Sequence, residues 1–185
     1  PFRLRLNDIL LKSDQPRDSR RMGRRVSHDD LSLPFRVGQV FVFFGGILRF
    51  DDLSDQFGEQ ISRFSRILYL CHRNADPDAI GSSFALAQAF GGSIGAVEDL
   101  SRTGASLAGA IGARPLINPV LEDYDLVVVV DASVRMQIGD RLPARYALVD
   151  HHLDTGLLDR ALFYIQRPAR STAEIVWRIL KENGK

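Results

Sequence analysis

The pattern of apolar and polar positions changes near residue 66. From there on, short apolar runs alternate with stretches in which apolar residues recur at a helical spacing. The runs predict strands at 66–71, 93–97, 125–130, 146–149 and 161–165. The stretches predict helices at 79–90, 101–112 and 171–182. Strands that alternate with helices predict an α/β fold, with a doubly wound and mainly parallel sheet flanked by helices.

Two local patterns support this prediction. The run 126–130, LVVVV, is apolar at every position, which is typical of a central strand that is buried on both faces. Ser171 and Glu174 have the spacing of a capping box, which predicts the start of the last helix.

The first 50 residues show no such sustained period, and we expect an irregular N-terminal extension with one added strand at 37–44. A helix is expected at 51–64, within a domain that covers residues 51–185. Residues 1–25 carry eight Lys or Arg and three Asp side chains, a net charge of +5 in a chain whose total is +1. This segment is expected to be a solvated, partly disordered tail. The alternative is that it contacts nucleic acid or another anionic surface.

Composition narrows the class of protein. A hydrophobic content of 45% and a charged content of 25% are ordinary for a soluble protein, and 185 residues suit one full domain. The longest apolar stretch, 40–48, is too short to span a bilayer. The single cysteine, Cys71, allows no internal disulfide, which favours a reducing compartment, the cytoplasm.

Three of the predicted strands are followed at once by acidic or imidazole side chains. These are His72, Asp76 and Asp78 after the first strand, Asp131 after the third, and Asp150, His151 and His152 after the fourth. Ligands of open parallel sheets bind beyond the carboxyl ends of the strands. We therefore expect these side chains to gather at one edge of the sheet.

Four carboxylates that converge on one edge need positive charge, because their mutual repulsion otherwise raises their pKa values. Divalent cations are the usual source of that charge. A set of oxygen and imidazole ligands without thiolate favours Mn²⁺, with Mg²⁺, Co²⁺ or Zn²⁺ as alternatives. Pro77 disfavours helical geometry at Asp76, so the following helix is expected to begin near Ala79 and to point its N-terminus at the site.

Four segments of the chain resemble, in order and spacing, the motifs of the DHH phosphoesterase superfamily. They are HRNADPDAIGS at 72–82, Asp131 after the run LVVVV, VDHH at 149–152 and STAEIVW at 171–177. The first motif particularly resembles that of archaeal DHH proteins and of the nanoRNase/pAp phosphatases, which are related to RecJ. The resemblance covers about residues 66–180 and corresponds to the N-terminal DHH domain alone.

The resemblance implies a role for each of these residues. His72 and Asp76 are expected to bind one cation, Asp78 and His151 a second, and Asp131 both of them. His152 is expected to contact the substrate phosphate, and Asp150 to orient the neighbouring ligands. Asn74 and Ser82 are expected either to shape the loop or to contact phosphate oxygens. Water activated by the two cations would then attack phosphorus, with Asp131, His151, His152 and Asp150 as the catalytic group.

The resemblance also implies a substrate class. It points to hydrolysis of phosphodiester or phosphomonoester bonds in nucleotides or short single-stranded oligonucleotides, with a homodimer as a candidate assembly and no membrane partner. RecJ-like exonuclease, cyclic-dinucleotide phosphodiesterase, pyrophosphatase and exopolyphosphatase activities remain alternatives within the enzyme class. A non-catalytic module for nucleic-acid binding or complex assembly is the alternative of another class.

Two features of the family have no counterpart in this sequence. Family members carry a further metal-binding Asp beyond the STAE-type helix, whereas Asp154 and Asp159 lie too close to His152 to match it. Members also carry a second, smaller domain that helps to bind substrate. The expectation is therefore that the sequence is part of a longer enzyme and that this part alone is impaired.

Overall fold

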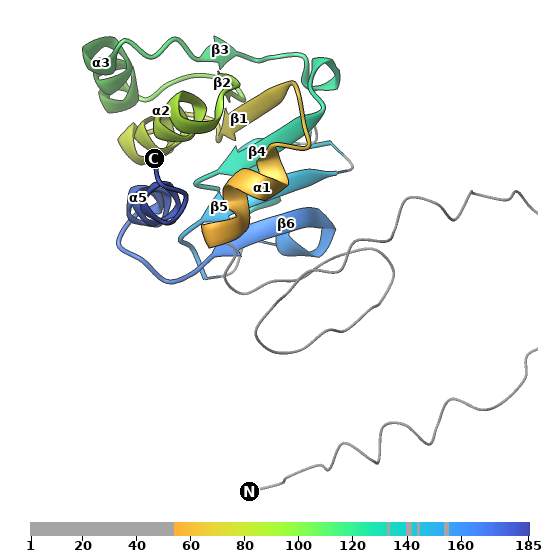
Figure 1. Ribbon diagram of the computed structural model, residues 1–185. Coiled ribbons are helices and arrows are strands. Elements are labelled where there is room, and N and C mark those ends of the chain that lie inside the picture. The colour runs from red at the N-terminus through yellow and green to blue at the C-terminus, as the bar shows by residue number, and fades with distance from the viewer. Residues whose placement is uncertain (1–53, 133, 140–141, 144, 154–155) are drawn as a thin grey trace, which may run out of the picture. The chain divides into compact units, whose positions relative to one another are not determined.

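A computed structural model describes residues 54–132, 134–139, 142–143, 145–153 and 156–185 (Figure 1). The predicted extension at 1–50 and its strand at 37–44 lie outside these residues. Within them the chain forms one parallel sheet of six strands in the order β3-β2-β1-β4-β5-β6. The strands are β1 (Ile67–Cys71), β2 (Ser93–Ala96), β3 (Leu116–Ile117), β4 (Leu126–Val130), β5 (Tyr146–Asp150) and β6 (Ala161–Gln166). The α/β prediction is confirmed.

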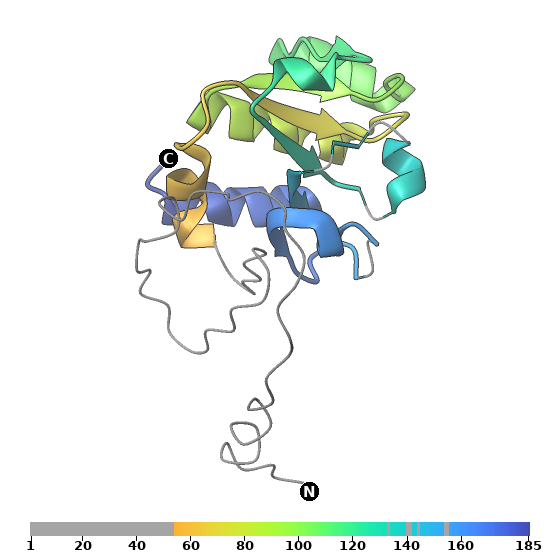
Figure 2. The same ribbon diagram turned by 90° about the vertical axis from the view of Figure 1, so that its right-hand side faces the viewer.

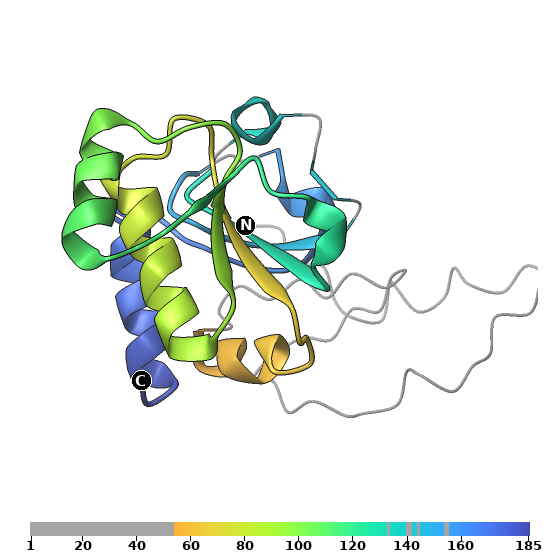
Figure 3. The ribbon, with the colours of Figure 1, turned by 90° about the horizontal axis from the view of Figure 1, so that it is seen from above.

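Three long helices cover one face of the sheet. They are α2 (Pro77–Phe90), α3 (Arg102–Ile111) and α5 (Thr172–Glu182), which Figure 3 shows along the same side. The other face is covered by short segments, which include the helix α4 (Arg135–Ile138) and the 3₁₀ turns η3 (Leu121–Asp123) and η4 (Leu158–Arg160). Figure 2 shows α4 apart from the long helices. In the described part of the chain, no helix is both long enough and apolar enough to cross a membrane.

The helix expected at 51–64 is shorter than predicted. A 3₁₀ turn, η2 (Ser54–Gln56), leads into α1 (Phe57–Ile61), and the first three positions of the predicted range lie outside the described residues. Gly58 weakens a helix at this place because its backbone loses more conformational entropy than other residues. Its N–H also donates to Asn183 Oδ1 at 2.9 Å, so this segment is held by the C-terminal helix.

Alternate residues of the central strands pack into different cores. Val128 and Val130 of β4 belong to the core beneath α2 and α5, whereas Val127 and Val129 belong to the core on the opposite face. All five residues of β4 are buried. Burial on both faces explains why this strand is apolar at every position.

The strand order reverses between β1 and β4. From β1 the chain proceeds outward to β2 and β3, then returns to β4 and proceeds outward in the other direction to β5 and β6. Such a reversal leaves a crevice beyond the carboxyl ends of the two central strands, which is where open α/β sheets bind ligands. Here those ends lead into His72 and Asp131.

Candidate metal centre

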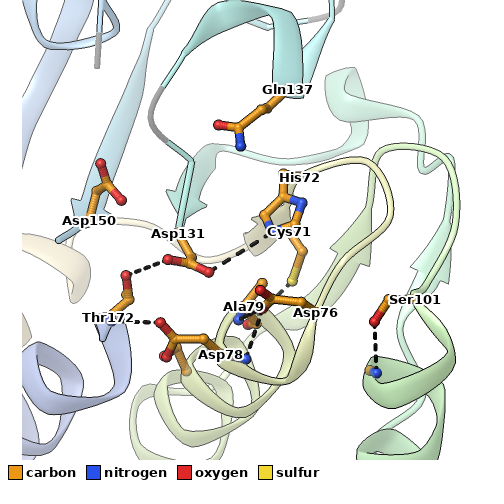
Figure 4. Close-up of polar contacts among 12 residues, drawn as sticks. Cys71, His72, Asp76, Asp78, Ala79, Ser101, Asp131, Gln137, Asp150 and Thr172 are labelled. Atoms are coloured by element: carbon orange, nitrogen blue, oxygen red, sulfur yellow. Dashed lines mark hydrogen bonds and ion pairs between the residues drawn. The ribbon is translucent and has the colours of Figure 1, made fainter. Parts of the chain in front are cut away.

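Asp131 lies at the centre of the candidate site. Its backbone adopts the left-handed region, with φ 59°, immediately after β4, and its N–H donates to Val149 O of the neighbouring strand at 3.0 Å. An Asp tolerates this conformation better than most residues do. The Asp131 carboxylate is almost completely buried, and Figure 4 shows it directed toward His72 and Thr172.

The two oxygens of Asp131 face two different imidazoles. Oδ2 lies 3.9 Å from His72 Nε2, and Oδ1 lies 3.6 Å from His151 Nε2. Both separations are longer than an ordinary hydrogen bond. Two ligand atoms that each lie about 2.1 Å from one ion are about 3 to 3.6 Å apart, so a small movement of the side chains would admit an ion between each pair.

Hydrogen bonds on the far side of each ring indicate which tautomer the neutral form of these two histidines adopts. His72 Nδ1 lies 2.6 Å from Arg73 O, and His151 Nδ1 lies 3.1 Å from Ala169 O. A carbonyl oxygen only accepts, so each Nδ1 carries the proton. In the neutral ring, Nε2 is then left with a lone pair that faces Asp131, which is the arrangement of a metal-ligating histidine held by a backbone carbonyl.

Among the described residues, two overlapping groups of side chains have ligand atoms close enough to hold an ion. One group is His72, Asp76 and Asp131, and the other is Asp131, His151 and His152; within each, the ligand atoms lie within 4.8 Å of one another. The groups share only Asp131. Mixed oxygen and imidazole ligands suit a divalent cation, so the residues present fit two neighbouring cation positions joined by one carboxylate.

Asp76 caps the helix that follows it. Its Oδ1 accepts from the N–H groups of Asp78 and Ala79 at 2.9 and 3.0 Å, and its backbone is extended, as Pro77 favours. The expected helix start near Ala79 is wrong by two residues, because α2 begins at Pro77. Proline suits the first helical position, where its fixed φ is helical and its missing N–H is not needed. Two N–H groups at the start of α2, those of Asp78 and Ala79, are therefore satisfied by Asp76.

Asp78 contacts the C-terminal helix and belongs to neither group of candidate ligands. Its Oδ2 accepts from Thr172 N at 2.8 Å, and its Oδ1 accepts from Ala173 N at 2.8 Å and from Ser82 Oγ at 3.4 Å. The carboxylate therefore caps the first turn of α5, where a negative charge is favourable. Its predicted role as a ligand of the second cation stays a prediction.

Asp150 and His152 form a pair at the end of β5. His152 Nδ1 lies 2.7 Å from Asp150 Oδ1, while Asp150 Oδ2 is buried without a hydrogen-bond partner among the described residues. Burial raises the pKa of Asp150, although His152 acts against this. Burial lowers the pKa of His152, but the hydrogen bond and charge of Asp150, with further carboxylates, outweigh it and leave that pKa raised.

The charge balance at Asp131 favours a bound cation. Burial raises the pKa of Asp131, and the nearby carboxylates of Asp78 and Asp76 raise it further, while a hydrogen bond from Thr172 acts in the opposite direction. In the described part of the chain, no Lys or Arg forms an ion pair with any of these carboxylates. The site thus holds more negative charge than its own side chains balance.

Asn74 and Ser82, which were expected either to shape the loop or to contact phosphate, differ in their surroundings. Asn74 is exposed in the loop after β1 and adopts φ 56°, a conformation that Asn tolerates well, so it shapes the loop. Ser82 is buried and its hydroxyl donates to Asp78. Their predicted contacts with phosphate stay predictions.

One residue of the site was not predicted from the sequence. Thr172, fully buried at the start of α5, donates from Oγ1 to Asp131 Oδ1 at 2.7 Å (Figure 4). Its position in the STAE segment was recognised, but only the capping role of Ser171 and Glu174 was inferred from it. The structure confirms that Ser171 accepts from Glu174 N at 3.3 Å.

Comparison with known proteins places these features in a family. Residues 66–185 match the family model described as the DHH family, N-terminal domain. The uncharacterized protein MJ0988 of Methanocaldococcus jannaschii is 36% identical over 130 residues, which are 63% of this chain and 39% of that protein. A second uncharacterized protein of the same organism, MJ1633, is 32% identical over 130 residues, or 63% of this chain and 26% of that protein. The chain therefore spans less than half the length of either relative.

Two solved structures share the fold. An exopolyphosphatase-related protein from Bacteroides fragilis superposes with a TM-score of 0.57 at 22% identity, over 71% of this chain and 43% of the other. A protein of Methanococcus jannaschii, assigned by name to the family II inorganic pyrophosphatases, superposes with a TM-score of 0.51 at 23% identity, over 64% and 41%. At this level of identity, both structures support the fold.

Proposed function

This chain belongs to the DHH family, and we propose that it acts as a metal-dependent phosphoesterase on nucleotides or short single-stranded oligonucleotides. The reaction is hydrolysis of a phosphodiester or phosphomonoester bond by water. Two divalent cations, with Mn²⁺ as the first choice, would be held by His72, Asp76, Asp131 and His151, together with Asp78, whose role rests on the resemblance to the family. The buried free thiol of Cys71 is compatible with the cytoplasm as the site of action.

The observation that carries this proposal is the position of the Asp131 carboxylate. Each of its oxygens faces the Nε2 of a different histidine, at 3.9 Å for His72 and at 3.6 Å for His151. A carboxylate that presents one oxygen to each of two imidazoles would allow each oxygen to bind a different cation, and two neighbouring cations would together activate water. A site for a single ion would need only one of these pairs of oxygen and imidazole.

The cations, when bound, acidify a water molecule and stabilise negative charge on the attacking and leaving oxygens. The protein contributes orientation. Backbone carbonyls hold His72 and His151 with Nε2 toward Asp131, and the left-handed turn at Asp131 keeps its carboxylate between them. The rigid ends of β1, β4 and β5 therefore fix the geometry before substrate arrives.

His152 is the group suited to contact the substrate. Its side chain is 39% exposed, and its Nδ1 is held by the buried carboxylate of Asp150. Because its pKa is raised, a larger fraction of the rings is protonated near neutral pH than for a free histidine. Protonated His152 would donate from Nε2 to a phosphate oxygen, while Asp150 keeps the ring in place.

A second candidate substrate comes from the solved relatives. The names of the two structures refer to exopolyphosphatase and inorganic pyrophosphatase, which favours a phosphoanhydride bond as the alternative. The metal centre would serve either bond, since in both reactions water attacks phosphorus and an oxygen of the substrate leaves. A non-catalytic binding module is less favoured, because the five predicted ligands His72, Asp76, Asp78, Asp131 and His151 are all present.

A substrate panel separates these candidates. Because these 185 residues alone are expected to be impaired, the complete protein would be incubated with Mn²⁺ and, in turn, 3′-phosphoadenosine 5′-phosphate, a dinucleotide, pyrophosphate and tripolyphosphate, with products measured by ion-exchange chromatography. We expect Mn²⁺-dependent release of mononucleotide or phosphate from the first two substrates. Preferential cleavage of the last two would establish the phosphoanhydride alternative instead.

The matched variants are Asp131→Asn and Asp125→Asn, which change the residues directly after and directly before β4. We expect Asp131→Asn to abolish hydrolysis, because an amide binds cations far more weakly than a bridging carboxylate does. Asp125→Asn should retain hydrolysis, since Asp125 lies at the opposite end of the strand. Hydrolysis that survives Asp131→Asn at the original rate would refute the proposed function.

A further inference from the structure

The first turn of α5 contacts two carboxylates of the site at once. Thr172 donates from Oγ1 to Asp131 Oδ1 at 2.7 Å and from its backbone N to Asp78 Oδ2 at 2.8 Å. Ala173 N donates to Asp78 Oδ1 at 2.8 Å. Three donors of one helix terminus therefore hold two carboxylates that arrive from β4 and α2 (Figure 4).

The hydroxyl of Thr172 selects one oxygen of Asp131. It donates to Oδ1, the same oxygen that faces His151, and leaves Oδ2 to face His72. The terminal torsion of an Asp side chain is broad, so without this bond the carboxylate plane is free to rotate. The hydrogen bond thus keeps one oxygen directed to each imidazole.

The threonine is itself held firmly. Its side chain is fully buried, and its position at the start of α5 is fixed by the two N–H groups that Asp78 accepts. A β-branched side chain on a helix has few rotamers, so the direction of its hydroxyl is well determined. The helix α5 packs against α2, which carries Asp78, so the shared core of the two helices supports these contacts.

From these contacts we infer that Thr172 is a positioning residue for the cation between Asp131 and His151. It does not bind the ion; it sets the orientation of the carboxylate that would be shared by both ions. This inference rests on the proposed function, because it assumes that two cations bind at Asp131. It assigns a role to Thr172, which is not a ligand and which lies at the start of α5, the helix that follows β6.

The test measures Mn²⁺ binding to the full 185-residue chain, by isothermal titration and by electron paramagnetic resonance of the bound ions. Thr172→Val removes the hydroxyl and keeps the shape and the backbone N–H. We expect its affinity for one of the two ions to fall by about 10- to 100-fold, as for other outer partners of metal ligands. The spectrum of the spin-coupled Mn²⁺ pair should weaken in parallel, and Thr172→Ser should restore both.

Controls separate positioning from a structural role. Thr103→Val removes a hydroxyl from the first turn of α3 and should bind Mn²⁺ as the wild type does. Thermal unfolding in EDTA reports the stability of each variant without metal, and Thr172→Ala provides a second hydroxyl-free variant if Thr172→Val does not fold. A loss of metal-free stability with unchanged affinity for both ions would overturn the inference.

The failure of the proposed function would have a different signature. A wild-type chain that binds no Mn²⁺ pair would reject the two-cation site itself, whatever the variants do. A wild-type chain that binds the pair, with hydroxyl-free variants of equal affinity, would reject only the role of Thr172.

Discussion

The amino and carboxyl ends of the central strands β1 and β4 differ in how their charged side chains are balanced. At their amino ends, Arg66 and Asp125 form an exposed ion pair, with Arg66 Nη2 2.8 Å from Asp125 Oδ1 and Arg66 N 3.0 Å from Oδ2. At their carboxyl ends, His72 and Asp131 face each other at 3.9 Å. The side chains of the first pair are 63% and 35% exposed, and those of the second are 12% and 5% exposed.

The two ends differ in charge balance and in contact with water. The amino ends contain matched charges, in contact with water, and need no ligand. The carboxyl ends contain carboxylates and imidazoles that are largely shielded from water and whose ligand atoms face the same small volume. Carboxylates that lie close together away from water repel one another, and a divalent cation bound among them would remove this repulsion. Function is therefore expected only at the carboxyl ends.

Removal of one imidazole at the carboxyl ends is expected to have the largest effect on Mn²⁺ binding and on hydrolysis. His72→Ala and His151→Ala should each reduce the number of bound Mn²⁺ ions from two to one and slow hydrolysis by more than about 100-fold, since loss of an outer partner alone costs about 10- to 100-fold. Isothermal titration and initial rates measure both quantities. Retention of two ions in either variant would show that the imidazoles are not ligands.

A smaller effect is expected from a change of pH on the stability of the folded protein. Its sign differs between the amino ends and the carboxyl ends of the strands. The pKa values of Asp131, Asp150 and His152 are raised in the folded protein, so each contributes stability that is lost as the pH rises through its folded pKa. The pKa of Asp125 is lowered by its hydrogen bond with Arg66, so its contribution is lost instead as the pH falls. Asp131 and Asp150 are buried, so their contributions are expected to outweigh that of the exposed Asp125.

We therefore expect the metal-free protein to become more stable as the pH falls from 8 toward the raised pKa values of Asp131 and Asp150. Thermal unfolding in EDTA between pH 8 and pH 5 measures this. The rise in melting temperature should be smaller in Asp131→Asn, which removes one of the groups. A melting temperature that falls steadily over this range would contradict the charge imbalance inferred for the site.

The smallest effect is expected at the amino ends. Asp125→Ala breaks the exposed pair with Arg66, and exposed ion pairs contribute little to stability. The melting temperature should change only slightly, and the affinity for Mn²⁺ should not change. A marked loss of Mn²⁺ binding in this variant would show that the two ends of the strands are coupled, contrary to the comparison drawn above.

Much of the fold was predictable because its strands bury both faces. The apolar runs identified every strand except β3, and the helical spacing identified α2, α3 and α5. The strand β3 has only two residues, both exposed, and α4 has only four residues, so neither is long enough to show a period. The start of α2 was missed because the constraint from Pro77 on Asp76 was weighed above the suitability of proline for the first turn.

The site was predictable only in part, for a related reason. The sequence predicted that His72, Asp131 and His151 lie close together, because each follows a strand and parallel strands have their carboxyl ends at one edge of the sheet. The contacts of Asp78 with Thr172 join residues 94 positions apart and depend on how α5 packs against α2. Nothing in the local sequence specifies that packing. It required the three-dimensional structure.

A crystal structure of the protein with Mn²⁺, with the ions located by their anomalous scattering, tests the account most directly. The account predicts two anomalous peaks, one between His72 and Asp131 and the other between Asp131 and His151, with both ions bound to the Asp131 carboxylate. A single ion that does not contact Asp131, or peaks only at surface carboxylates away from these histidines, would contradict it.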